Sequence, residues 1–100
     1  MIYLLKKSQK KGKRFKIIMP DIQDMIHHFG SDIGKTFVDH GDIKKKQAWI
    51  ARHKTNKNWD NPHAGIYYSR HLLWGKNKDL ASNIRELNKK DKVHILNMID

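Results

Sequence analysis

Short apolar runs separated by polar turns fill the first third of the chain. Residues 3–5 and 15–19 are rich in apolar side chains, and the polar segment between them, 8–13, contains a glycine. This pattern predicts a β-hairpin. Pro20-Asp21 is a second turn signal, and the run that follows it, residues 24–29, is expected to form a third strand. The chain therefore begins with a small sheet.

Residues 35–39 follow a loop that contains two glycines, Gly30 and Gly34. Thr36, Phe37 and Val38 are residue types that favour a half-buried strand. The sequence therefore predicts a fourth strand at this position.

The hydrophobic period becomes helical after residue 41. Asp42 is placed to cap a helix that runs to about His53. One stripe of this helix carries Ile43, Gln47, Ile50 and Lys54, and Trp49 flanks the stripe. Residues 55–65 contain three Asn, a Pro and a Gly, so this segment is expected to be irregular.

Two further helices are predicted in the second half of the chain. Residues 66–74 are apolar on nearly all sides, and Gly75 can end this helix. Asp79 can cap the next helix, which carries Leu80, Ile84 and Leu87 at helical spacing. The last apolar stretch, residues 93–99, is compatible with a strand, a helical turn or a docking tail.

The fold class that this order of elements predicts is α+β. We expect a small N-terminal antiparallel β-sheet of three to four strands, followed by about three short helices. A chain of 100 residues is long enough for one core and too short for two. Residues 1–13 are interpreted as a basic N-terminal arm or first hairpin strand, residues 14–90 as a single domain, and residues 91–100 as an apolar C-terminal tail.

Positive charge dominates the composition. Twenty-one Lys and Arg oppose ten Asp and Glu, which gives a formal charge of +11. An excess of this size predicts an anionic partner, such as nucleic acid, an anionic membrane surface or an acidic protein patch. Lysine is a point charge without the bidentate geometry of arginine, so general electrostatic adhesion is favoured over the reading of specific bases. The candidate anion- or partner-binding residues are Lys6, Lys7, Lys10, Lys11, Lys13, Arg14, Lys44, Lys45, Lys46, Arg52, Lys54 and Lys57.

The large aromatic side chains are expected to build the core. Trp49, Trp59 and Trp74 are predicted to share one core together with Leu73. Arg70 lies on the most apolar predicted helix, where a charge requires a partner. Asp39 or a carbonyl of the Asn-rich loop could supply that partner, so Arg70 is interpreted as a structural residue.

The sequence offers little support for catalysis or for a bound cofactor. Seven histidines are present, but their spacing does not resemble a zinc site, and cysteine is absent. The segment Gly30–Thr36 has three residues between its glycines where a phosphate-binding P-loop needs four. We therefore expect no metal, no cofactor, no small-molecule substrate and no enzymatic activity.

No apolar run approaches the roughly 18 residues of a membrane-spanning helix.

An ordered series of short motifs runs through the central part of the chain. It consists of His28-Phe29-Gly30-Ser31, Asp39-His40, Ala51-Arg52-His53, Asn58-Trp59, Ala64-Gly65 and Ser69-Arg70-His71-Leu72-Leu73-Trp74. This series resembles a family of small basic proteins encoded by nucleocytoplasmic large DNA viruses and their giant-virus relatives. The similarity extends from His28 to Leu87. It implies a viral setting and a chain that is present in the virion or assembled with it.

Two functions are compatible with these observations. The first is a minor capsid protein wedged between larger capsid subunits through basic and aromatic surfaces, located in the virion and, during assembly, in the host cytoplasm. The second is a nucleic-acid-binding protein that packages or condenses the genome through lysine–phosphate contacts. Both use the same electrostatics, so charge alone does not separate them.

Overall fold

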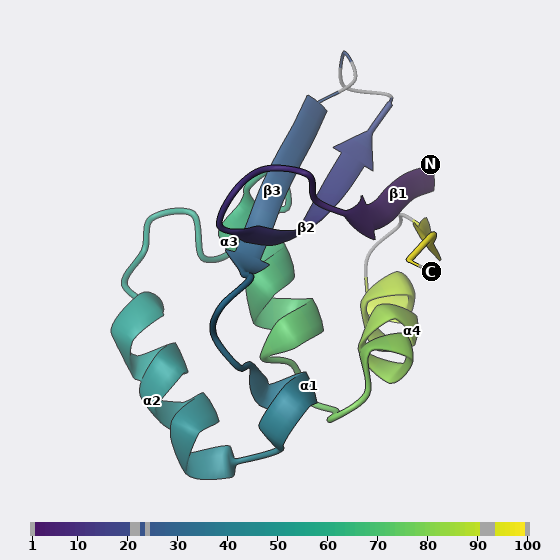
Figure 1. The fold of residues 1–100 in the computed structure, drawn as a ribbon. Coiled ribbons are helices and arrows are strands. Elements are labelled where there is room, and N and C mark those ends of the chain that lie inside the picture. Colours follow the sequence, from purple (N-terminus) through teal and green to yellow (C-terminus); the bar gives the residue numbers. More distant parts are fainter. Residues whose placement is uncertain (1, 21–22, 24, 91–93, 100) are drawn as a thin grey trace.

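A four-stranded sheet forms one layer of the protein (Figure 1). The computed structural model describes residues 2–20, 23, 25–90 and 94–99. The strands are β1 (Ile2–Lys7), β2 (Lys13–Met19), β3 (Met25–Ser31) and β4 (His94–Asn97), in the spatial order β3-β2-β1-β4. β2 runs antiparallel to both β1 and β3, whereas β4 lies parallel to β1. The sheet is therefore mixed.

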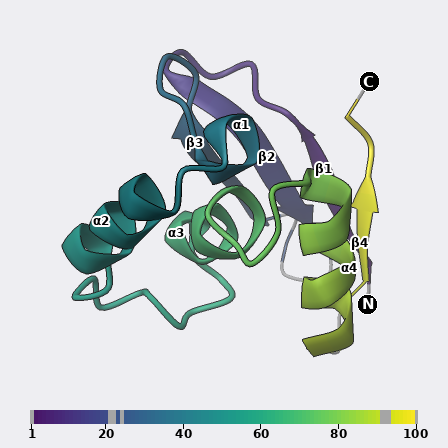
Figure 2. The same cartoon turned by 90° about the horizontal axis from the view of Figure 1, so that it is seen from below.

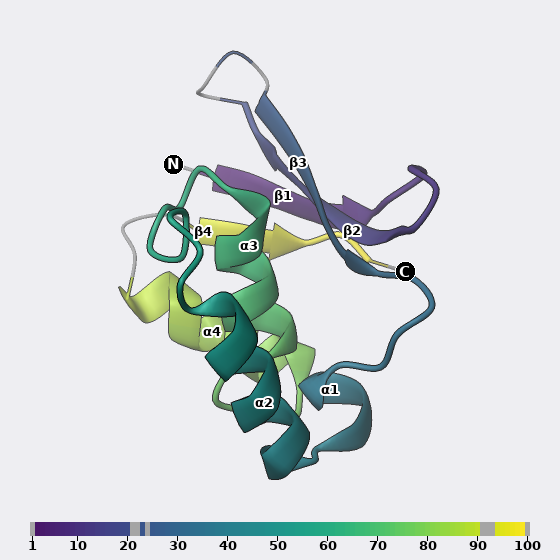
Figure 3. The ribbon, with the colours of Figure 1, turned by 90° about the vertical axis from the view of Figure 1, so that its left-hand side faces the viewer.

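The helices form a second layer on one face of this sheet (Figures 2 and 3). They are α1 (Phe37–His40), α2 (Ile43–His53), α3 (Gly65–Tyr68) and α4 (Leu80–Lys90). α3 continues directly into η1 (Ser69–Leu73), a π-helical segment, and α4 packs against η1 and β4. The predicted α+β class is thus confirmed. No helix in the described ranges is long and apolar enough to cross a bilayer.

The sequence correctly places the first hairpin and the third strand, and it also places α2, the continuous α3–η1 segment and α4. Asp42 accepts hydrogen bonds from the backbone N–H groups of Lys44 and Lys45 at the start of α2. Asp79 accepts the backbone N–H of Ser82 at the start of α4, as a capping residue does. The predicted turn residue Asp21, the strand residue Asp24 and residues 91–93 and 100 of the predicted tail lie outside the described residues.

The predicted fourth strand is wrong in position and direction. Residues 37–40 form the short helix α1, because the Asp39 carboxylate accepts both the backbone N–H and the hydroxyl of Thr36 and so fixes a helical first turn. The fourth strand is instead β4, from the C-terminal stretch. β4 joins the sheet parallel to β1, so the sheet is not purely antiparallel.

The core lies between the sheet and the helices, and the strands contribute alternate residues to it. The buried side chains are Tyr3, Leu5, Phe15, Ile17, Met19, Phe29 and Ile95 from the strands, and Tyr67, Tyr68, Leu72, Leu73, Ile84 and Leu87 from the helices. Asn83 is buried among them, and its side-chain amide donates to the carbonyl of Leu72. Leu73 is in the core, whereas none of the three tryptophans is among these buried residues.

The predicted stripe on α2 is only partly buried. Ile43 is 60% exposed, Gln47 and Lys54 are also exposed, and α2 contains no buried residue. The half-buried positions of α2 are Lys46, Trp49, Ile50 and His53. α2 therefore packs on the rest of the protein mainly through aromatic side chains.

Candidate anion-binding site

A basic depression lies between the β1–β2 turn and the loop that joins β3 to α1. Its volume is about 710 Å³. Six cationic and two acidic side chains line it, so its formal charge is +4. The charged lining residues are Lys7, Lys10, Lys11, Lys13, Arg14, Lys35, Asp32 and Asp39, and we call this depression the basic basin.

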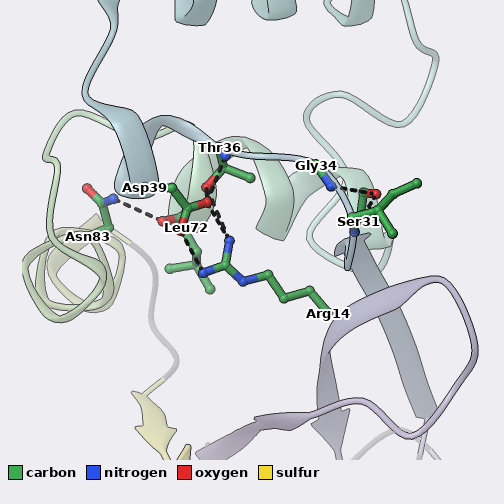
Figure 4. Close-up of polar contacts among 8 residues, drawn as sticks. Arg14, Ser31, Gly34, Thr36, Asp39, Leu72 and Asn83 are labelled. Atoms are coloured by element: carbon green, nitrogen blue, oxygen red, sulfur yellow. Dashed lines mark hydrogen bonds and ion pairs between the residues drawn. The ribbon is translucent and has the colours of Figure 1, made fainter.

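One wall of the basic basin is fixed by an ion pair between a strand and a helix (Figure 4). Arg14 Nη1 donates to Asp39 Oδ2 at 2.7 Å, and Arg14 Nη2 donates to Asp39 Oδ1 at 3.0 Å. Asp39 Oδ2 also accepts the backbone N–H of Thr36 at 2.8 Å and the Thr36 hydroxyl at 2.9 Å. Hydrogen bonds from Arg14 and Thr36 hold the pKa of Asp39 well below its usual range. The Arg14 charge is therefore already compensated.

The turns on either side of the basic basin are also held by hydrogen bonds. In the hairpin turn, the backbone N–H of Lys13 donates to the carbonyl of Lys10, and Gly12 supplies the positive φ of +83° that the turn requires. In the opposite loop, Ser31 Oγ accepts the backbone N–H of Gly34 at 3.3 Å, and Figure 4 shows this contact. The exposed lysines of the hairpin are thus carried by an ordered turn.

A row of stacked aromatic rings connects α1, α2 and the end of η1. The rings of Trp49 and Trp74 are nearly parallel, with centroids 5.0 Å apart, and Trp59 lies 5.8 Å from Trp49. His53 stacks on Trp49 at 4.4 Å, and His40 contacts Trp74 edge-on at 5.6 Å. The tryptophans do meet one another, as predicted, but in a half-buried row at the edge of the core. Their location inside the core is the part of the prediction that is wrong.

Arg70 extends this aromatic row. Its guanidinium lies 4.3 Å from the centroid of the Trp59 ring. It donates to the carbonyl of Trp59 at 3.0 Å and to the carboxylate of Asp60 at 2.7 Å. A carbonyl of the Asn-rich loop is thus a partner of Arg70, as one of the two predictions stated. Asp39 is not a partner of Arg70, because its carboxylate is paired with Arg14.

A second, smaller cationic pocket lies where the aromatic row meets α2. Its volume is about 460 Å³, and we call it the aromatic pocket. Lys35, Lys45 and Arg52 line it together with His40, Ala48 and Trp74. Lys35 also lines the basic basin, so the two cationic surfaces meet at this residue.

The structure distributes the predicted anion-binding residues over several surfaces. The basic basin contains Lys7, Lys10, Lys11, Lys13 and Arg14, and the aromatic pocket contains Lys45 and Arg52. Lys6 lies on the face of the sheet that points away from the helices. Lys44, Lys54 and Lys57 are exposed at positions outside both pockets.

Lys46 has a structural role instead. Its ammonium group donates to the carbonyl of Gly75 at 2.7 Å and lies 4.6 Å from the centroid of the Phe37 ring. Burial lowers the pKa of Lys46. This ammonium group is therefore occupied within the fold.

Lys35 is the site residue that the sequence prediction missed. It stands alone between Gly34 and Thr36, without the run of positive charges that identifies the hairpin or α2. Only the path of the loop between β3 and α1 brings it to both cationic surfaces.

Several histidines have contacts within the fold. His28 Nδ1 is 2.7 Å from the hydroxyl oxygen of Ser8, and His40 Nδ1 accepts the backbone N–H of Asp42 at 2.8 Å. His53 Nδ1 lies 2.8 Å from the carbonyl oxygen of Trp49. Within the described part of the chain, no group of three or more His, Asp or Glu side chains could hold a metal ion.

Fold and site together define a small α+β protein with two adjoining cationic pockets. The chain belongs to DUF5754, a family of unknown function that matches residues 3–53. This matched part, just over half of the chain, runs from β1 to the end of α2. It contains all the charged residues of the basic basin, whereas Trp59, Arg70 and Trp74 lie beyond it. No curated protein and no solved structure matches the chain.

Proposed function

We propose that this chain is a non-enzymatic structural protein of the virion of a large DNA virus, held to an anionic neighbour by its basic basin. The observation that carries the proposal is the convergence of four hairpin lysines with Lys35 around one depression. All five side chains belong to exposed residues, and Arg14 neutralises the nearby Asp39. A concave surface with this charge attracts carboxylates or phosphates.

The neighbour in this proposal is a larger capsid subunit with an acidic patch. Support for the viral setting comes from the motif series between His28 and Leu87, which resembles that of small basic proteins of large DNA viruses. Ordered turns on both sides of the basic basin suit a binding role, because little conformational entropy is lost when the partner docks. The protein would reside in the virion and, during assembly, in the host cytoplasm.

Nucleic-acid binding is the second candidate, and one observation favours it. The aromatic pocket combines Trp74 and His40 with Lys35, Lys45 and Arg52, and it adjoins the basic basin. Aromatic rings beside cationic groups are the elements with which proteins bind single strands. A strand whose phosphates lie along the basic basin could place a base near Trp74.

A pair of triple variants tests the role of the basic basin. In the first, Lys10, Lys11 and Lys13 are changed to Ser, and in the matched control Lys44, Lys54 and Lys57 are changed to Ser. Both remove three positive charges from exposed positions. Binding of polyglutamate and of a single-stranded oligonucleotide is measured over a range of salt concentrations.

We expect the hairpin variant to lose most of its affinity and the control to retain it. If phosphates are the ligand, the slope of log K against log salt should fall by about 2 in the hairpin variant. Equal losses in both variants would show that net charge alone, and not the basic basin, drives binding.

The location of the protein separates the two candidates. Mass spectrometry of purified particles and of their isolated shells and genomes should find the chain with the shell at a fixed stoichiometry. Recovery only with the genome would replace the capsid proposal by the nucleic-acid proposal. Absence from the particles would refute the virion assignment.

A further inference from the structure

No helix of the described part of the chain covers the face of the sheet that points away from the helical layer, and the side chains on this face include two ordered rows. Figure 3 shows all helices on the other side of the sheet. Because strand residues alternate between faces, the buried side chains of β1 and β2 leave Leu4, Lys6, Lys16 and Ile18 on this outer face. The pairing register then determines which outer side chains are adjacent.

The first row is apolar and crosses all four strands. Leu4 pairs with Ile18 on one side and with Leu96 on the other, and Ile18 pairs with Ile26. Ile26 is 47% exposed and Leu96 is 41% exposed. With strands about 4.8 Å apart, this row is about 14 Å long. We call Leu96, Leu4, Ile18 and Ile26 the apolar row.

The second row contains two lysines and lies directly beside the first. Lys6 pairs with Lys16, and Lys16 pairs with His28. Each of these residues is two positions along its strand from a member of the apolar row. The ammonium group of Lys16 donates to Gln9 Oε1 at 2.7 Å, and His28 Nδ1 lies 2.7 Å from the hydroxyl oxygen of Ser8, so the start of the β1–β2 turn contacts this row. The strands carry no Asp or Glu among residues 2–7, 13–19, 25–31 and 94–97. The outer face thus presents an apolar stripe with positive charge along one side.

We infer that this outer face is a docking surface for an acidic amphipathic segment of another protein. Apolar side chains of the partner would cover the apolar row, and carboxylates beside them would pair with Lys6 and with the ammonium protons of Lys16 that Gln9 does not accept. Such complementarity fixes the orientation as well as the identity of the partner. The inference goes beyond the proposed function, because neither Lys6 and Lys16 nor any member of the apolar row lines the basic basin, which adjoins this face only through Ser8 and Gln9.

Other occupants match the surface less well. A second copy of the chain would bring another +11 of formal charge, including its own Lys6 and Lys16, against this face. Nucleic acid would leave the apolar row against phosphates, and the outer positions offer no Phe, Tyr or Trp on which bases could stack. An anionic membrane would satisfy the lysines. However, Leu4 and Ile18 are half-buried within the sheet and do not project as an inserted side chain must.

The test uses the full chain and a defined probe. The probe is a fluorescein-labelled helical peptide of about 18 residues, with Leu on one side and Glu on the flank, and its binding is followed by fluorescence anisotropy. Ile18→Thr keeps a β-branched side chain on the strand but makes the centre of the apolar row polar. Ile33→Thr is the matched control, because Ile33 is 93% exposed in the loop before α1. Lys6→Gln is paired in the same way with Lys44→Gln.

Ile18→Thr should weaken peptide binding by about five- to tenfold, since removal of a central apolar contact has an effect of this order. Lys6→Gln should weaken binding severalfold and reduce its salt dependence, whereas both controls should bind as the wild type does. A peptide with Lys in place of Glu should not bind. The variant with Lys10, Lys11 and Lys13 changed to Ser should keep its affinity for the peptide, which separates this surface from the basic basin. Circular dichroism and thermal unfolding verify that each variant is folded.

Three results would overturn the inference. The first is equal peptide affinity of Ile18→Thr and wild type. The second is a dimer in sedimentation experiments that Ile18→Thr dissociates, which would assign the face to a second copy of the chain. The third is binding to phosphatidylserine vesicles that depends on Ile18, which would assign it to a membrane.

Discussion

Replacing Asp39 with Asn should destabilise the protein and at the same time strengthen its binding of anions. Four donors converge on the Asp39 carboxylate, two from Arg14 and two from Thr36, at 2.7 to 3.0 Å. An Asn side chain of the same shape has one acceptor oxygen, so its amide nitrogen must face some of these donors. The side chains of Arg14 and Asp39 are 29% and 22% exposed, which limits screening by solvent.

The expected loss of stability is about 2 kcal/mol. Weakening the cap on α1 contributes about 1 kcal/mol. Loss of the partly exposed ion pair contributes about 1 kcal/mol more. For a domain of this size the total corresponds to a decrease in Tm of roughly 10 °C. Urea unfolding at pH 7 measures this difference directly.

The difference between wild type and Asp39→Asn should depend on pH in a defined direction. The pKa of Asp39 is lower in the folded protein than in the unfolded chain, where it is about 3.9. The carboxylate therefore contributes its full stabilisation above about pH 5, where it is ionised in the unfolded chain as well. As the pH falls further toward the folded pKa, the unfolded chain binds a proton first and the contribution is lost. The two unfolding curves should converge at low pH.

The anion-binding measurement provides the second part of this prediction. Asp39→Asn removes a negative charge from the basic basin and frees the Arg14 guanidinium, so polyglutamate should bind more tightly. Asp32→Asn is the matched control, because Asp32 is exposed and lines the same basin. It should increase the affinity without a comparable loss of stability. If Asp39→Asn unfolds at the same urea concentration as wild type at pH 7, the Arg14–Asp39 pair does not anchor α1 and the reasoning fails.

Three further substitutions test the packing. Trp74→Ala should lower the free energy of unfolding in urea by about 2 kcal/mol. This is less than the loss expected for a fully buried Trp, because the Trp74 ring is half-buried against Trp49. A loss above about 4 kcal/mol would show that Trp74 belongs to the core. Gly30→Ala should lower thermal stability by about 1–3 kcal/mol, because φ is +79° and a Cβ would lie 2.8 Å from Cδ1 of buried Leu73; an unchanged Tm would contradict this geometry. Asn83→Ala should cost about 2–4 kcal/mol by chemical denaturation, since it leaves the buried carbonyl of Leu72 and two half-buried backbone groups of Asn77 without these hydrogen bonds. Ser82→Ala, at the neighbouring and less buried position, should cost clearly less.

Local patterns explain why much of the fold could be predicted. The hairpin follows from two apolar runs around a polar turn, and α2 and α4 begin at the aspartates expected to cap them. At α1 the prediction and the structure disagree, because the strand preference of Thr36, Phe37 and Val38 predicts a strand where the structure has a helix. The sequence did contain the competing signal, since Thr36 and Asp39 have the spacing of a capping box. Capping hydrogen bonds outweighed the intrinsic preference of three residues.

The site was only partly predictable for a different reason. The hairpin lysines are consecutive or nearly so, and any turn would have kept them together. Lys44, Lys45 and Lys46 are also consecutive, yet Lys45 lines the aromatic pocket while Lys46 hydrogen-bonds to Gly75 inside the fold. Because consecutive residues of a helix point in different directions, only some of these lysines can face the rest of the protein. Which side of α2 faces inward depends on aromatic partners that are distant in the sequence.

By itself, the sequence determined the class of the fold, most element boundaries and the excess of positive charge, because turns, caps and periodicity act over a few residues. The tertiary structure alone decided which charges converge, since Lys35 and the hairpin lysines are brought together by a loop. It also decided the tryptophan stack at the edge of the core and the parallel pairing of β4 with β1. These features depend on contacts between residues that are far apart in the chain, and no local pattern encodes such contacts.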